Sequence, residues 1–136
     1  MNPPTTEKQS LLRNALWYNA LFSILSGLAI LVANHWLVRF LGLPEQVSLI
    51  VFGVSLIGYA ALLLINARRP EIKTTDAWAA IIMDAVWVAG SFVLIFSVPF
   101  SAGGKWLIVL LAEVVMAFAV WQIFGIRRLR KGQQTA

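Results

Sequence analysis

Apolar residues along this chain fall into four long blocks, and short polar segments separate them. The blocks cover about 11–38, 47–66, 77–98 and 105–126. A helix needs about 20 residues to cross the hydrocarbon core of a bilayer, and each block reaches that length. None of the blocks alternates between apolar and polar residues as the strands of a membrane barrel do. The pattern therefore predicts an all-α membrane protein with four membrane-spanning helices.

The polar segments between the blocks are short, so we expect consecutive helices to run antiparallel as an up-and-down bundle. The longest segment, ARRPEIKTTD, carries a proline and offers Thr75 or Asp76 as the N-cap of the third helix. Outside the four-helix domain of residues 11–126, we expect a polar N-terminal tail over 1–10 and a basic C-terminal tail over 127–136.

Composition supports a membrane protein, because 60% of the residues are hydrophobic and only 12% are charged. In soluble domains about a quarter of the residues are charged. The formal net charge of +5 comes from basic residues in tails and loops, where they orient the helices and contact anionic lipid. We therefore expect the lipid bilayer, and not nucleic acid, to be the partner of these charges.

Most of the Lys and Arg residues lie on one side of the predicted bundle. Nine lie there: Lys8, Arg13, Arg68, Arg69, Lys73, Arg127, Arg128, Arg130 and Lys131. Only Arg39 and Lys105 lie on the other side. The positive-inside rule then places both termini in the cytoplasm. The residues expected to act as orientation signals or to contact lipid headgroups are Arg68, Arg69, Arg127, Arg128, Arg130 and Lys131.

Several kinds of chemistry are excluded by the residues that are absent. There is no cysteine, so disulfides, thiolate metal sites and thiol redox reactions cannot occur. The single histidine, His35, cannot supply both ligands of a bis-histidine haem within one chain. No motif of a nucleotide-binding, hydrolytic or metal-dependent enzyme is present. We expect no metal, no cofactor and no catalytic residue, and the sequence gives no sign of an enzyme.

Two carboxyl groups lie inside predicted spans, Asp84 in the third and Glu113 in the fourth. A charge at mid-bilayer costs at least about 2.5–3.5 kcal/mol, and no basic residue lies at a comparable depth. We expect both groups to be protonated, or hydrogen-bonded around a small water-filled cavity. Their depths differ by about 9 Å, so they cannot share a proton without bridging water.

Other polar residues form two layers with these carboxyl groups. The candidates are Asn19 and Tyr59 near the depth of Asp84, and Ser26, Ser55 and Ser91 near the depth of Glu113. Because helical spacing gathers the polar positions into a stripe on each helix, we expect all four stripes to face the interior, with Asp84 touching Asn19 or Tyr59. Such residues form either a protonatable site or hydrogen bonds that fix the packing. Gln122 lies on the opposite face from Glu113 and is expected to mark a contact with another subunit.

Weak internal similarity relates the two halves of the chain. GYAALLLINARR (58–69) aligns without gaps with AFAVWQIFGIRR (117–128), and YNALF (18–22) resembles MDAVW (83–87). A repeat of this kind predicts two similar hairpins related by an axis along the membrane normal. Shared constraints on spans that end at basic residues can produce the same match, so both explanations stay open.

Three stretches, NAxFSxxSGL at 19–28, HWLVRFLGLP at 35–44 and DAxWVxGS at 84–91, resemble a group of small bacterial membrane proteins with four helices and no assigned function. The resemblance covers most of the chain and implies the bacterial inner membrane, but it transfers no activity and no catalytic residue. Small multidrug exporters have a similar length and four spans. They carry their essential glutamate in the first helix, where this chain has Asn19, and many lack its strong positive bias, so the resemblance to these exporters fails on both features.

Three hypotheses of function follow from these observations. The first is a non-enzymatic subunit or accessory protein of a membrane complex, which predicts partner-facing stripes and a tight, dry interior. The second is a small proton-linked transporter, which predicts a hydrated cavity reaching Asp84 or Glu113 and an oligomer. The third is a lipid- or quinone-associated membrane anchor with a hydrophobic slot near Trp87, Trp121 or Tyr59. The sequence favours the first, with a homo-oligomer or a larger membrane complex as its setting.

Overall fold

The computed structural model describes residues 3–134, with the side chains of residues 9–132. The described chain forms five helices: α1 (Pro3–Val32), α2 (Asn34–Phe40), α3 (Ile50–Ala67), α4 (Thr74–Ser97) and α5 (Ala102–Gln134). Four segments are long and apolar enough to cross a membrane, namely Gln9–Val32, Ile50–Ala67, Thr74–Ser97 and Ala102–Gly132. The expected all-helical architecture with four candidate spans is confirmed, and α2 is an additional short helix.

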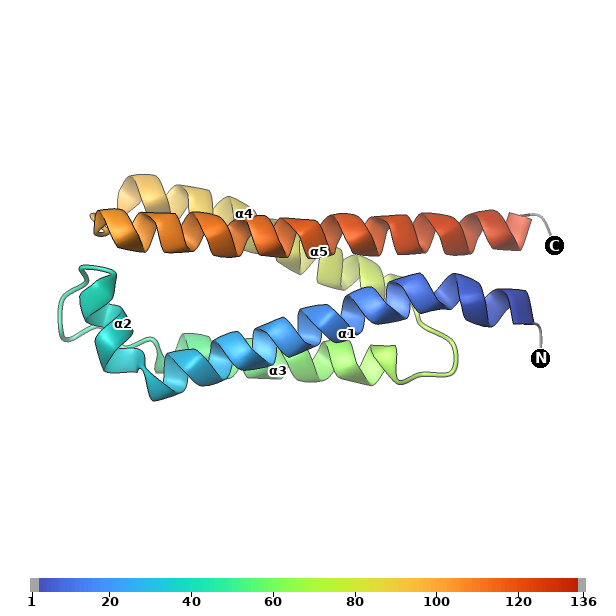
Figure 1. Cartoon of the computed structure of the whole chain (residues 1–136), viewed down its shortest axis with the longest axis horizontal. Coiled ribbons are helices and arrows are strands. Elements are labelled where there is room, and N and C mark those ends of the chain that lie inside the picture. Colours follow the sequence, from blue (N-terminus) through green and yellow to red (C-terminus); the bar gives the residue numbers. More distant parts are fainter. Residues whose placement is uncertain (1–2, 135–136) are drawn as a thin grey trace.

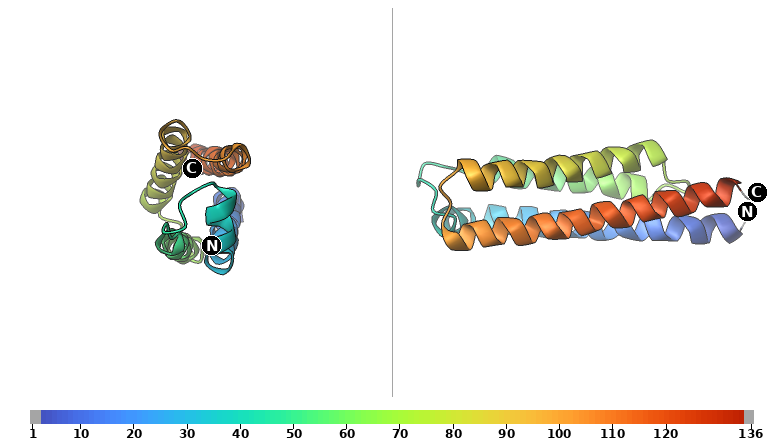
Figure 2. Two further views of the ribbon diagram at one scale, coloured as in Figure 1. Left: turned by 90° about the vertical axis from the view of Figure 1, so that its left-hand side faces the viewer. Right: turned by 90° about the horizontal axis from the view of Figure 1, so that it is seen from above.

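The four long helices run alternately up and down (Figure 1). Both described ends of the chain and the link between α3 and α4 lie at one end of the bundle, called the terminal end below. The other end, called the distal end, carries α2 and the link between α4 and α5. Seen along the bundle, the helices follow each other in the order α3, α1, α5, α4 (Figure 2). Helices α3 and α4 make few contacts and diverge toward the distal end.

Two glycines allow the close approach of α1 and α3. A Cβ atom built on Gly27 would lie 2.8 Å from the carbonyl oxygen of Gly53, and one built on Gly53 would lie 3.0 Å from the carbonyl oxygen of Gly27. Each glycine therefore makes room for the backbone of the other helix, as small residues do in pairs of membrane helices. Helices α1 and α5 approach in a similar way, because Gly125 faces the backbone of Leu12.

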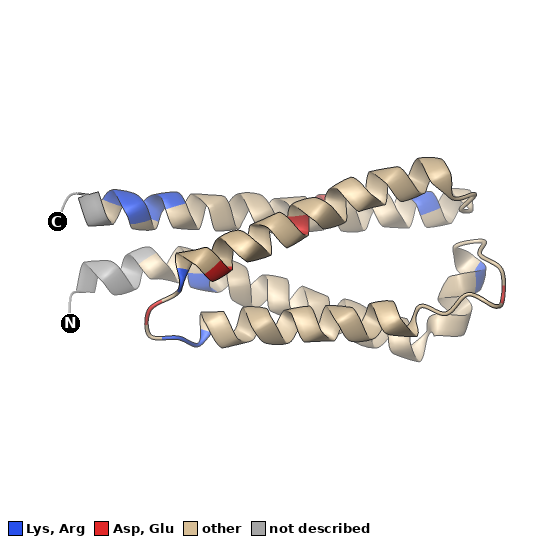
Figure 3. Cartoon of the chain, turned by 180° about the vertical axis from the view of Figure 1, so that it is seen from behind, with Lys and Arg blue, Asp and Glu red and all other residues tan. Residues whose placement is uncertain are grey.

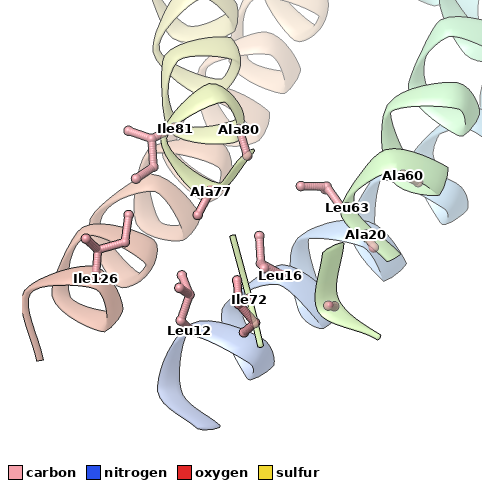
Figure 4. Packing of buried hydrophobic residues seen from close by; sticks show 11 residues of the cluster. Leu12, Leu16, Ala20, Ala60, Leu63, Ile72, Ala77, Ala80, Ile81 and Ile126 are labelled. Carbon is pink, nitrogen blue, oxygen red and sulfur yellow. The ribbon is translucent and has the colours of Figure 1, made fainter. Parts of the chain in front are cut away.

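Apolar side chains fill the bundle toward its terminal end (Figure 4). The cluster takes residues from all four long helices and from the link between α3 and α4, among them Leu12, Leu16, Leu63, Ile72, Ala77, Ile81 and Ile126. Each of these side chains is almost completely buried. Packed apolar side chains therefore separate the middle of the bundle from the basic residues gathered at its terminal end (Figure 3).

The first span is shorter than the sequence pattern predicts. The apolar block over 11–38 suggests one continuous helix, but α1 ends at Val32 and the backbone bends at Ala33 before α2. The bend is fixed by tertiary contacts and not by a glycine or a proline. The Asn34 side-chain oxygen accepts a hydrogen bond from the Leu49 amide at 2.7 Å, and the Leu41 carbonyl accepts one from the Ser101 amide at 2.9 Å.

Other helix ends also differ from the predicted boundaries. Helix α4 begins at Thr74 after Lys73, without a side-chain cap, so the expected capping by Thr75 or Asp76 is wrong. Asn66 holds this turn instead, because its side chain accepts a hydrogen bond from the Lys73 amide at 3.1 Å and donates one to the Lys73 carbonyl at 3.3 Å.

The two predicted tails are helical where the structure describes them. Helix α1 begins at Pro3, inside the expected N-terminal tail, and α5 runs to Gln134, through most of the expected C-terminal tail. Proline is favoured in the first turn of a helix, and no proline interrupts the end of α5. Residues 1–2 and 135–136, and the side chain of Lys8, lie outside the described part of the chain.

Candidate functional site

Asp84 is the centre of a buried hydrogen-bond cluster, and only 3% of its surface is exposed. The Tyr59 hydroxyl donates to its Oδ1 at 2.8 Å. Asn19 donates through Nδ2 to Oδ2 at 2.9 Å, and Gln122 donates through Nε2 to the same oxygen at 3.2 Å. The expected contact of Asp84 with Asn19 or Tyr59 is confirmed, and it involves both residues. Each of the four long helices contributes one side chain to this cluster.

The geometry makes Asp84 a hydrogen-bond acceptor with spare capacity. A carboxylate offers about four lone-pair directions, and the three donors here occupy three of them. The remaining direction belongs to Oδ1, which receives only the Tyr59 hydroxyl. Tyr59 also lies within hydrogen-bond distance of the Ala80 carbonyl, at 3.2 Å, so its donor is shared. Oδ1 therefore keeps the capacity to accept one further hydrogen bond.

The face of α5 that points into the bundle is the opposite of the predicted face. Gln122, expected at a subunit contact, is completely buried, and Glu113, expected in the interior, is exposed. The prediction that these residues occupy opposite faces is right, but the choice of the inward face is wrong. Small residues determine which face of α5 packs against the other helices, because Ala112 is buried and Gly125 lies against the backbone of Leu12.

The three candidate serines have different environments. Ser91 is buried, and its hydroxyl donates to the Trp87 carbonyl at 2.8 Å. Ser55 is exposed and donates to the Val51 carbonyl at 2.7 Å. Because a serine can satisfy its hydroxyl on its own helix, it needs no partner in the interior. Ser55 nevertheless lies on the face of α3 that lines the cavity described below, at its exposed side. Ser26 is half-buried.

A partly open cavity of about 260 Å³ extends from Asp84 toward the distal end of the bundle. All four long helices line it, and most of its wall is apolar or aromatic, including Phe22, Ile30, Phe52, Leu56, Trp87, Leu111 and Val115. Its polar groups are Asp84, Asn19 and Tyr59 of the cluster and the serines Ser23, Ser26 and Ser55. A dry cavity of roughly 150 Å³ in a protein interior can hold benzene. This cavity is therefore large enough for a small organic molecule.

The cavity opens between α3 and α4. Its exposed lining residues, Phe52, Ser55 and Met83, all belong to these two helices, whereas the lining residues from α1 and α5 are buried or half-buried. The rings of Phe52 and Trp87 stack across this opening with centroids 4.8 Å apart. The opening therefore lies on the side of the bundle, between two candidate spans.

Two buried polar atoms at this site have no hydrogen-bond partner within the described chain. They are Nε1 of Trp87, which lines the cavity, and Oε1 of Gln122, whose Nε2 donates to Asp84. The indole N–H is a donor and the amide oxygen is an acceptor. The cavity wall therefore keeps one unused donor, and the Asp84 cluster keeps one unused acceptor.

The predicted basic residues at the link between α3 and α4 make contacts within the chain. Arg69 lies 3.8 Å from the Asp76 carboxylate, and the Arg68 guanidinium lies 5.9 Å from the centre of the Trp17 ring. Arg13 has a structural role that sequence analysis missed. It donates to the Arg69 carbonyl at 2.8 Å and so fastens α1 to this link. An arginine that begins a span has the pattern of an orientation signal, so nothing in the sequence indicates this contact.

The basic residues of α5 are exposed. Arg127, Arg128 and Lys131 line a broad groove on the outer face of the helix, together with Glu113. Arg130 is also exposed but does not line this groove.

Comparisons with known proteins leave the site to be interpreted from its own chemistry. No family model matches the chain, and neither the curated proteins nor the solved structures give a match. Among the residues that the structure describes, no three His, Asp or Glu side chains are grouped so that they could hold a metal ion.

Proposed function

We propose that this chain is a small membrane carrier that binds a largely apolar organic cation inside the bundle, against Asp84, in competition with a proton. The observation that carries this proposal is a carboxyl group at the floor of a cavity that no Lys or Arg side chain lines. Ionisable residues within membrane spans are costly, and they commonly mark substrate or proton pathways.

The aromatic walls of the cavity favour a cation, and so does the carboxyl group of Asp84 at its floor. Phe22, Phe52, Tyr59 and Trp87 line the space beside Asp84. The face of an aromatic ring attracts cations, and this attraction grows when the site is shielded from water. A positively charged group near Oδ1 would compensate the carboxylate, and the apolar remainder of the molecule would fill the volume toward the distal end.

The position of the opening supports a substrate that dissolves in the bilayer. Phe52, Ser55 and Met83 border the opening between α3 and α4, and apolar packing closes the other direction, toward the terminal end. A molecule that partitions into the acyl chains would reach Asp84 without passing through that cluster. When no cation is bound, a proton on Asp84 removes the buried charge, so proton and cation would compete for the same group.

The orientation of the protein follows from its charges. The terminal end carries most of the described Lys and Arg residues, and the distal end carries Arg39 and Lys105 (Figure 3). By the positive-inside rule, the terminal end with both termini lies in the cytoplasm. A multi-pass protein of the bacterial inner membrane is what the resemblance to small bacterial membrane proteins implies.

A role as a subunit or accessory protein is the second candidate, and the exposed carboxyl group of Glu113 favours it. A carboxyl group on the outer face of a span is costly in contact with acyl chains. Contact with a second copy or with another membrane protein would remove Glu113 from lipid. We rank this candidate second because a cavity that reaches Asp84 does not agree with the dry interior that the accessory role predicts.

The proposal is tested by binding benzyltrimethylammonium to the purified full chain in phosphatidylcholine nanodiscs. Asp84→Asn should weaken binding of this cation at least tenfold, because it removes the charge that attracts the ligand in a site of low dielectric constant. The substitution keeps the shape of the side chain, and Gln122 can turn its unpartnered oxygen toward the new amide. Neopentylbenzene, a neutral molecule of the same shape, should bind both proteins equally. Lowering the pH should weaken binding of the cation to the wild type only.

Glu113→Gln is the matched control, since it makes the same change of acid to amide outside the cavity. It should bind the cation as the wild type does. In proteoliposomes, a gradient of the cation should drive proton movement through the wild type and not through Asp84→Asn. Equal affinity of the wild type and Asp84→Asn for the cation would overturn the proposal, and so would binding of the neutral molecule alone.

A further inference from the structure

A groove of about 940 Å³ runs along α5, where Leu11 of α1 also lines it, apart from the cavity at Asp84. Its polar end lies toward the terminal end, where Arg127, Arg128 and Lys131 line it, and its middle is formed by Phe124, Val120 and Ala117. We propose that this groove binds one phospholipid with an anionic headgroup. The proposal is independent of the function proposed above, because no residue lines both sites.

The charges of the groove match a phosphate group. Arg127 and Arg128 precede Lys131 by four and three positions, so each lies beside Lys131 on the surface of α5. All three are exposed at the end of a candidate span, where lipid headgroups lie. Arginine binds phosphate through paired hydrogen bonds, and basic pockets beside spans on the cytoplasmic side are typical sites for anionic lipids.

The wall below these charges matches an acyl chain. Exposed Phe124, Val120 and Met116 stand beside the small side chain of Ala117, which leaves space between them. About 15 Å of helix separates Arg127 from Ala117, which is half of a hydrocarbon core of about 30 Å. A chain from the inner leaflet would therefore end near Ala117. Glu113 lies about 21 Å from Arg127 along the helix, beyond the reach of that leaflet.

The neighbouring basic residues show that charge alone does not define this site. Arg69 and Arg68 are engaged with Asp76 and Trp17, and Arg130 lies outside the groove. A general attraction of the terminal end for an anionic membrane would involve all of them. A bound lipid requires only the residues that line the groove, and this difference supplies the test.

Native mass spectrometry of the delipidated full chain, titrated with phosphatidylglycerol, measures the binding of one lipid. Arg127→Gln with Arg128→Gln should weaken binding about 30-fold, since each basic residue near an anionic surface contributes a factor of about five. The matched control, Arg68→Gln with Arg130→Gln, removes the same charge at the same end and should retain wild-type affinity. Ala117→Phe should weaken binding while leaving every charge in place, because it fills the space for the acyl chain.

Two controls separate a lipid site from other anion binding, and a third checks folding. Phosphatidylcholine should bind much more weakly than phosphatidylglycerol, and inorganic phosphate should not displace the bound lipid. Circular dichroism verifies that each variant is folded, which is expected because every substituted side chain is exposed. Equal loss in both double variants would show a general electrostatic effect and overturn the proposal. Unchanged binding in Ala117→Phe, or displacement by phosphate, would also overturn it.

Discussion

Substitution of Gly27 by alanine should destabilise the bundle by about 1–3 kcal/mol, the usual cost of adding atoms to a packed interior. The new methyl group would lie 2.8 Å from the carbonyl oxygen of Gly53 and 2.8 Å from Cγ1 of Ile57. A side chain such as Ile57 can rotate, but the backbone carbonyl of Gly53 cannot move without its helix. The substitution therefore forces α1 and α3 apart.

The free energy of unfolding can be measured by circular dichroism in mixed micelles, where unfolding of membrane helices is reversible. Gly58→Ala in α3 is the matched control, because a Cβ atom at Gly58 meets nothing within 4 Å. It adds the same methyl group within the same pair of helices and should raise stability by roughly 0.5–1 kcal/mol, the advantage of alanine over glycine inside a helix. Gly53→Ala should cost somewhat less than Gly27→Ala, since its nearest contacts are 3.0 and 3.1 Å.

The double variant Gly27→Ala with Gly53→Ala provides a further check, because the two glycines lie at the same contact between α1 and α3. Once the first methyl group has separated the helices, the second should cost less than it does alone, so the two effects should not add. If Gly27→Ala and Gly58→Ala had the same stability, the close crossing of α1 and α3 would be refuted. Simple additivity in the double variant would show that the two glycines act at separate contacts.

Two further predictions concern the orientation of α5 and of the whole chain. Gln122→Leu should lower the free energy of unfolding by about 0.6–1.7 kcal/mol, because it removes one buried hydrogen bond to Asp84. Glu113→Gln should have little effect on the monomer in the same assay. A larger loss of stability in Glu113→Gln than in Gln122→Leu would mean that Glu113 faces the interior. In the cysteine-free chain, Gly132→Cys should react with an impermeant maleimide from the cytoplasmic side and Ala102→Cys from the opposite side, and reversed labelling would contradict the proposed topology.

The candidate spans could be predicted from the sequence because the bilayer sets their length. About 20 apolar residues are needed to cross it, and this requirement is visible in any long apolar block. The bend at Ala33 could not be predicted in the same way, because neither glycine nor proline marks it. It depends on the contact between Asn34 and the Leu49 amide, which joins two segments that the sequence shows as separate.

The faces of the helices could be predicted only where polar residues and packing agree. On α1, the polar stripe that contains Asn19 and Ser23 is buried, as expected. On α5, the charge of Glu113 suggested the inward face, but the bundle is closed by small residues such as Ala112 and Gly125. Gln122 lies on the same face as these small residues. Close packing of helices limits the size of side chains at each contact, and this limit outweighs the cost of one exposed carboxyl group.

The hypothesis of an internal repeat gives a physical meaning to the pair of Asn19 and Asp84. These residues occupy equivalent positions in YNALF and MDAVW, and they are hydrogen-bonded to each other at 2.9 Å. A two-fold axis along the bundle brings equivalent residues together, so two aspartates here would place like charges in contact. Asparagine in one half replaces that repulsion with a hydrogen bond and leaves a single carboxyl group.

The same axis would make the contact between α3 and α4 as close as that between α1 and α5. Instead, α1 and α5 pack together, whereas α3 and α4 diverge and the cavity opens between them. The remaining carboxyl group belongs to α4, which borders that opening, and Tyr59 of α3 reaches it from the other side of the gap. Both departures from symmetry therefore meet at one place. A bundle with equivalent halves would pack both pairs of helices alike and would have two acids at this level or none, whereas the described chain presents one acid, Asp84, beside the gap between α3 and α4.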